Sequence, residues 1–119
     1  MAADPRLTER VRGALARRRG VSEKRMFGGV AFLLNGNMCV GILGERLMVR
    51  VGADDYATAL RRPHARPMDF TGRPLTGFVY VLPAGIRTTA QLRRWIDAGV
   101  DFAKSLGKKT GRAKPRRRT

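Results

Sequence analysis

The sequence has few of the residues from which catalytic and metal sites are usually built. It contains one cysteine, Cys39, and one histidine, His64, among 119 residues. A single cysteine excludes an intrachain disulfide and is typical of a reducing compartment. One cysteine and one histidine also supply few of the side chains from which a nucleophilic triad or a zinc site is built. We therefore expect a buried, unreactive thiol, a solvated loop histidine, no enzyme and no cofactor.

Acidic residues and long apolar runs are scarce as well. Nine Asp and Glu stand against 25 Lys and Arg, which gives a formal net charge of +16. Such an excess favours polyanionic partners such as nucleic acid. No stretch is long and apolar enough to cross a membrane, and the N-terminus lacks the apolar region of a secretory signal. We therefore expect a cytoplasmic protein without a membrane partner.

The positive charge is concentrated at the C-terminus. Eight basic residues and no acid lie between Lys104 and Thr119, and they carry half of the net charge. Because this stretch has little to bury, we expect a folded domain over 1–107 and a disordered basic tail over 108–119. The tail lacks the Arg-Gly-Arg-Pro core of an AT-hook, so it predicts attraction to phosphate without base reading. The residues expected to contact nucleic acid are Lys108, Lys109, Arg112, Lys114, Arg116, Arg117 and Arg118.

Periodicity and turn residues predict an α+β domain. Asp4-Pro5 marks a helix start, and Gly20 is expected to end that helix. Asn35-Gly36 between apolar runs predicts a type I′ hairpin, because both central residues of that turn need positive φ. We expect an antiparallel sheet of about five strands, with a three-strand meander first and three helices mainly on one face. The expected elements are a helix over 5–19, strands over 25–34, 37–43 and 46–51, a helix over 53–61, strands over 68–70 and 78–83, and a helix over 89–106.

The carboxylates show no persuasive catalytic pair. Asp97 and Asp101 lie one helical turn apart, with Arg93 and Arg94 at ion-pairing distance in sequence. We expect this face of the last helix to be a solvated, ion-paired surface. Asp54-Asp55 is expected to form the start of the helix over 53–61.

Two glycines, Gly28-Gly29, raise the question of a phosphate-binding loop. Such a loop follows a strand and opens a helix, whereas these glycines precede an apolar, strand-like stretch. We therefore expect both inside the first strand, at a bulge or at a close approach of another backbone.

That first strand is apolar on both alternating sets of residues, so both of its faces should be covered. Three helices can cover one face, and a second subunit can cover the other. We therefore expect a homodimer, with small residues under a loop as the alternative. The expected interface residues are Phe27, Gly29, Ala31 and Leu33.

The stretch RMFGGVAFLLNGNMCVGILGERLMVRV (25–51) resembles the first half of the TfoX N-terminal domain, a bacterial domain linked to competence regulation. RPMDFTGRPLTGFVYVLP (66–83) resembles its later segment, and the similarity extends over residues 5–106. The family pattern consists of Met26, Phe27, Gly28 and Gly29 followed by Gly72, Tyr80 and Pro83. The resemblance implies transcriptional regulation, partly through other regulators, and no catalytic residues. Full-length members carry a second, C-terminal domain, in whose place the basic tail stands here.

Three functions remain open at this point. The leading one is a non-enzymatic interaction module whose tail adds nucleic-acid affinity. A small-molecule binder or enzyme with a cleft between sheet and helix is another. The third is a nucleic-acid-binding protein that uses folded basic residues, namely Arg17, Arg18, Arg19, Arg61, Arg62 and Arg66.

Overall fold

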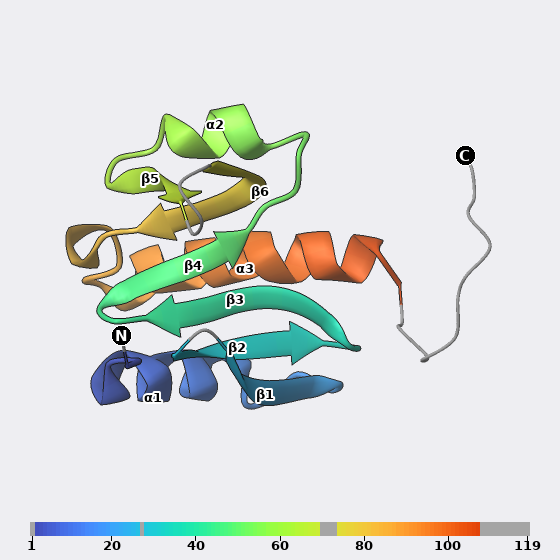
Figure 1. Ribbon diagram of the computed structural model, residues 1–119. Helices are drawn as coiled ribbons and strands as arrows, with labels where there is room; N and C mark the ends of the chain where they lie inside the picture. The colour runs from blue at the N-terminus through green and yellow to red at the C-terminus, as the bar shows by residue number, and fades with distance from the viewer. Residues whose placement is uncertain (1, 27, 70–73, 108–119) are drawn as a thin grey trace.

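The computed structural model describes residues 2–26, 28–69 and 74–107 of the chain. They form one antiparallel sheet of six strands, in the order β1-β2-β3-β4-β6-β5, with three α-helices (Figure 1). The predicted α+β class is confirmed, with six strands instead of about five. The elements are α1 (Pro5–Leu15), β1 (Val21–Met26), β2 (Gly29–Leu34), β3 (Asn37–Leu43), β4 (Arg46–Arg50), α2 (Tyr56–Leu60), β5 (Ala65–Asp69), β6 (Pro74–Val81), the 3₁₀ turn η1 (Pro83–Gly85) and α3 (Thr89–Ser105).

The predicted strand over 25–34 is wrong, because this region contains parts of two strands. β1 pairs antiparallel with β2, and Gly28 lies between them with a φ of 80°. β1 lies at the edge of the sheet, and four of its six residues are exposed. An edge strand that buries little needs no apolar alternation, which is why the polar sequence VSEKRM did not read as a strand.

The meander that follows β2 is as predicted. Asn35 and Gly36 have φ values of 53° and 84°, as a type I′ turn requires. The second turn, at Gly44, also has a positive φ of 63°. The hairpins therefore place β3 and β4 in the centre of the sheet.

β5 begins at Ala65, three residues before the strand expected over 68–70. It is the other edge strand and contains Pro67. An edge strand tolerates proline because one side of its backbone needs no hydrogen bonds to a neighbour. The predicted strand over 68–70 was therefore too short at its beginning, while Phe70 lies outside the described residues.

Two of the three helices are shorter than predicted. α1 ends at Leu15, the last residue of that helix in the core, and Arg17, Arg18 and Arg19 are exposed beyond it. Nothing apolar remains there to hold another turn against the sheet. α2 spans only Tyr56–Leu60.

α3 spans Thr89–Ser105, one residue short of the helix predicted over 89–106, and it begins with a capping box. The hydroxyl Oγ1 of Thr88 accepts from the backbone N–H of Gln91, and the Gln91 side chain accepts from the N–H of Thr88. The packing of α3 against the sheet weakens toward the end of the helix, where Phe102 is only half-buried and Leu106 is exposed.

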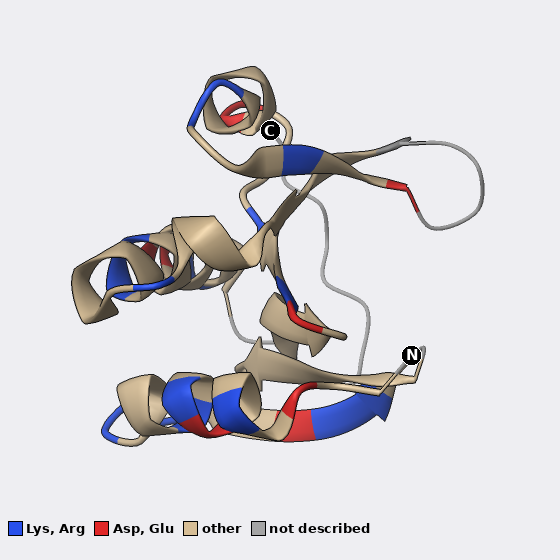
Figure 2. Ribbon diagram, turned by 90° about the vertical axis from the view of Figure 1, so that its left-hand side faces the viewer, with Lys and Arg blue, Asp and Glu red and all other residues tan. Residues whose placement is uncertain are grey.

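All three helices pack on the same face of the sheet (Figure 2). Gly99 of α3 is buried against β3, where a Cβ would lie 2.4 Å from the carbonyl oxygen of Cys39. The main core joins one face of the central strands to the helices and includes Leu7, Val11, Leu15, Phe32, Val40, Leu47, Val49, Ala59, Val79, Val81, Leu92, Trp95, Ile96 and Val100.

Candidate functional sites

The face of the sheet opposite the helices is the first candidate surface. Antiparallel register places one row of side chains across all six strands of this helix-free face, and direct neighbours in such a row point to the same side. The row reads Lys24, Ala31, Gly41, Met48, Tyr80 and Arg66. It is therefore apolar in the middle and basic at both ends.

The middle of the helix-free face forms a second, smaller core. Met48, Met68 and Tyr80 are buried there, and burial raises the pKa of the Tyr80 phenol. Partly buried apolar side chains surround these three, namely Met38, Leu43 and Phe78. Leu33 pairs with Met38 just beyond a register shift between Phe32 and Leu33. Half-buried apolar groups on a face without helices are a surface that another molecule can cover.

Arginines on β4 border this apolar centre. The guanidinium of Arg46 lies 4.2 Å from the centre of the Tyr80 ring. That of Arg50 lies 5.6 Å from the Phe78 ring and 5.2 Å from the Phe102 ring. Cations over aromatic rings are held in place while their charge stays available to a partner.

The expected interface residues of β2 have different positions on this face. Gly29 and Ala31 are buried within the protomer, whereas Leu33 is half-buried and available for contact. Phe27 lies outside the described residues.

The glycine pair divides into two roles. A Cβ on Gly29 would lie 2.1 Å from the carbonyl oxygen of Ile42, so the prediction of a close backbone approach is confirmed at this position. Gly28 instead belongs to the β1–β2 turn, which corrects its placement inside a strand. No helix follows this turn, because β2 begins at Gly29 itself.

The second candidate surface is a cleft of about 690 Å³ between α3 and the segment that contains α2. Its upper wall is positioned by Val51 and Gly52, whose N–H groups both donate to the carbonyl of Gly77 (2.8 and 3.1 Å). Gly52 has a φ of 87°, and the Phe102 ring packs directly against it. This backbone turn leads the chain away from β4 and leaves the cleft between the two helices.

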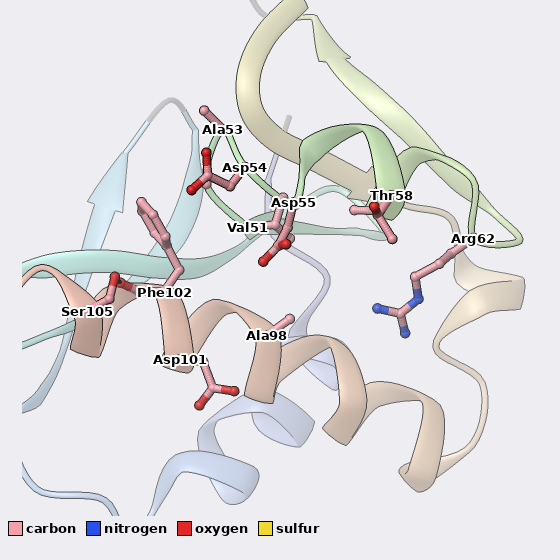
Figure 3. A pocket seen from close by; sticks show the side chains of 12 residues that line it. Val51, Ala53, Asp54, Asp55, Thr58, Arg62, Ala98, Asp101, Phe102 and Ser105 are labelled. Atoms are coloured by element: carbon pink, nitrogen blue, oxygen red, sulfur yellow. Dashed lines mark hydrogen bonds between the residues drawn. The ribbon is translucent and has the colours of Figure 1, made fainter.

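The cleft has apolar walls and charged borders. Figure 3 shows Asp55 and Arg62 extending from the α2 segment and Phe102 rising from α3 toward residues 51–54. Arg62 stacks on Trp95 at 3.6 Å, and its pKa is lowered by burial and then by the charge of Arg94. The residues that line the cleft are Val51, Gly52, Ala53, Asp54, Asp55, Thr58, Ala59, Arg62, Ala98, Asp101, Phe102 and Ser105.

The expected ion pairs on α3 are wrong. Asp97 pairs with Arg18, which follows α1, at 3.4 Å, instead of with an arginine of its own helix. Within the described part of the chain, Asp101 takes part in no ion pair. Packing of α3 beside the end of α1 brings Arg18 within reach, and sequence spacing alone could not show this.

The two rare residues lie where they were expected. Cys39 is fully buried, its Sγ contacts the carbonyl oxygen of Phe32 at 3.3 Å, and burial raises its thiol pKa to about 11. His64 is exposed in the connection before β5. Among residues 2–26, 28–69 and 74–107, no three His, Cys, Asp or Glu side chains gather in a way that could hold a metal ion.

The folded arginines proposed as a nucleic-acid surface are not gathered in one place. Arg17, Arg18 and Arg19 follow α1, whereas Arg61 and Arg62 follow α2, and these two helices lie at opposite ends of the sheet (Figure 1). Arg66 is on the helix-free face. The basic tail residues, Lys108, Lys109, Arg112, Lys114, Arg116, Arg117 and Arg118, lie outside the described residues.

Comparisons with known proteins give one finding on ancestry. The family model of the TfoX N-terminal domain matches residues 13–103. No curated protein matches the chain. None of the helices in the described residues is long and apolar enough to span a membrane. Since the family model covers most of the 119 residues, the chain belongs to the TfoX N-terminal domain family.

Proposed function

We propose that the protein is a non-enzymatic, competence-regulator-like interaction module that acts in the cytoplasm as a homodimer. The observation that carries the dimer is the helix-free face, where half-buried Met38, Leu43 and Phe78 surround a small apolar core and half-buried Leu33 pairs with Met38. Family membership supports the regulatory role. The proposal gives no catalytic role to Cys39, whose buried thiol stays protonated at neutral pH.

A two-fold dimer would bring the same face of two protomers together. The apolar centres would meet near the axis, and a stable interface needs at least about 1,000 Å² of buried surface in total. Lys24, Arg46 and Arg66 would remain toward the rim, where they repel the same residues of the second copy. Because salt screens such repulsion, the dimer should tighten as salt is added.

Sedimentation equilibrium tests the dimer across a salt series. The wild-type protein should approach twice the 13.2 kDa monomer mass at high micromolar concentration. Leu33→Asp should give a folded monomer, because this side chain is half-buried on the helix-free face. The matched control is Leu106→Asp, the same substitution at an exposed leucine after α3, which should leave association unchanged. A monomeric wild type at these concentrations would contradict the proposal.

A second proposed function is sequence-independent nucleic-acid binding through the basic tail. Its support is compositional, since seven basic residues and no acid lie between Lys108 and Arg118. Cations on an extended chain can each neutralise a phosphate and release counterions. In this proposal the folded domain contacts other transcriptional regulators while the tail holds the assembly near DNA or RNA.

A further inference from the structure

The cleft between α2 and α3 collects negative charge in a strongly basic protein. Asp54, Asp55 and Asp101 line it, which is three of the nine acids in the chain. Arg62 is the one cation among the described lining residues, and it lies beyond Thr58 at the end away from Ser105. The half of the cleft nearest the C-terminus of α3 is therefore acidic.

These carboxylates are not used by the fold. Asp55 occupies the N-cap position of α2, yet its side chain makes no capping hydrogen bond. Among the described residues, none of the three acids forms a salt bridge, although Glu9, Glu23 and Asp97 all do. Asp54 and Asp55 precede α2 as expected, but Asp55 does not cap the helix with its side chain. Among the described residues, the three carboxylates are therefore left without a cationic partner.

The last turns of α3 supply the wall of the cleft, and the same helix leads directly into the basic tail. Phe102 and Ser105 line the cleft, and the helix closes at Gly107 with a φ of 76°. Asp101 precedes Gly107 by six residues, or about 9 Å along a helix that rises about 1.5 Å per residue. A chain that turns back at Gly107 therefore meets the acidic half of the cleft first.

We propose that this cleft holds the chain's own basic segment, residues 108–118, through pairing of its Lys and Arg side chains with Asp54, Asp55 and Asp101. By the chain statistics of linkers, six residues span about 13 Å on average, which covers the distance to Asp101. Attachment at Gly107 gives the segment an effective concentration of about millimolar at the cleft, so weak contacts suffice. The inference goes beyond the proposed function and does not depend on the dimer.

The lining of the cleft suits long cationic side chains. The aliphatic stems of Lys and Arg can lie on the Phe102 ring and on Ala98, while their charged ends reach the carboxylates. Two arginines oppose a bound cation: Arg62 at the far end of the cleft, and Arg50, whose guanidinium lies 5.2 Å from the Phe102 ring. The three carboxylates outnumber them and favour the half beside Asp54 and Asp55. A segment held in this way has fewer charges free for a polyanion, so the cleft would moderate the affinity of the tail for nucleic acid.

A nitroxide on the full chain with Thr119→Cys tests this placement by paramagnetic broadening in NMR spectra. Cys39 is buried with a thiol pKa of about 11, so the label attaches to the new cysteine. At low salt the amide signals of Asp54, Asp55 and Phe102 should broaden. The broadening should disappear at about 1 M salt, where the Debye length falls to about 3 Å.

The variant that removes the acidic half, Asp54→Asn with Asp55→Asn and Asp101→Asn, should lose the broadening. Asp97→Asn is the matched control, because Asp97 lies on the same helix but outside the cleft. Lys108→Gln with Lys109→Gln and Arg112→Gln tests the pairing from the tail without touching the folded domain, and it should also lose the broadening.

Three results would overturn the proposal. They are no broadening in the wild type, equal broadening in the Asp54/Asp55/Asp101 variant, and equal broadening in the tail variant. A mixture of spin-labelled unenriched chains with ¹⁵N-enriched unlabelled chains tests whether the tail of one molecule binds the cleft of another. Broadening in that mixture would place the tail of a second copy in the cleft and refute an intramolecular contact.

Discussion

Replacing Gly99 with alanine should destabilise the protein, although alanine is the better helix former. Gly99 is buried in α3, and a Cβ there would lie 2.4 Å from the carbonyl oxygen of Cys39 and 2.9 Å from Cγ1 of Val40. The nearer atom belongs to the backbone of β3, a central strand, so it cannot rotate away as a side chain can. α3 would have to move outward from the sheet and loosen the main core.

The size of the effect follows from two opposing contributions. Alanine in place of glycine favours a helix by about 1 kcal/mol. Overpacking costs about 1–3 kcal/mol, and a rigid backbone contact places Gly99→Ala at the upper end of that range. The net loss should be about 2 kcal/mol in the free energy of unfolding. For a domain of about 100 residues this lowers Tm by about 8 °C.

Gly13→Ala is the matched control in α1. No atom lies within 4 Å of a Cβ built on Gly13, and the residue is exposed. The same substitution should therefore stabilise the protein there by about 0.5–1 kcal/mol. Thermal unfolding followed by circular dichroism at one protein concentration compares the two. Equal gains in Tm for both variants would refute the close packing of α3 on β3.

Two further predictions concern charge. Arg12 binds Glu23 through two hydrogen bonds of 2.6 and 2.9 Å and thereby lowers the pKa of the Glu23 carboxyl. A lowered pKa stabilises the fold above the unfolded-state pKa of about 4.3, and this stabilisation disappears as pH falls through the folded pKa. Urea unfolding should therefore show Glu23→Gln less stable than the wild type at neutral pH, with the difference shrinking below about pH 4; a constant difference would contradict the ion pair. For the tail, fluorescence anisotropy on random and A·T-rich duplexes should give equal affinities and a log–log salt slope of about −4 to −5 if about five cations engage. Truncation after Gly107 should remove that slope. Equal binding by the full and the truncated chains would exclude the tail as the segment that binds nucleic acid.

The parts of the fold that depend on local chemistry could be predicted from the sequence. The Asn35-Gly36 turn and the Thr88 capping box are each set by residues a few positions apart, and the turn has the predicted geometry. The two edge strands were misread for a common reason. β1 and β5 expose most of their residues, so neither shows the alternation that marks a half-buried strand.

The candidate sites were less accessible to sequence reasoning. The apolar residues of β2 did predict a sheet face without helices. That Met68 and Tyr80 also lie on this face follows only from the pairing of β5 with β6. The acidic cleft was missed because its carboxylates come from segments about 50 residues apart. Asp54-Asp55 and Asp101 each had a local explanation, and only the packing of α2 beside α3 brings them to one cleft.

The composition of the two edge strands limits how these molecules can associate. β1 presents Glu23, Lys24 and Arg25 in succession, and β5 presents Pro67. Charged side chains and proline on an edge prevent a second molecule from extending the sheet strand by strand. Open-ended stacking into fibrils is thereby disfavoured at both margins of the sheet. In the proposed dimer, contact between the two helix-free faces ends at a pair of molecules, whereas growth along the edges would not stop.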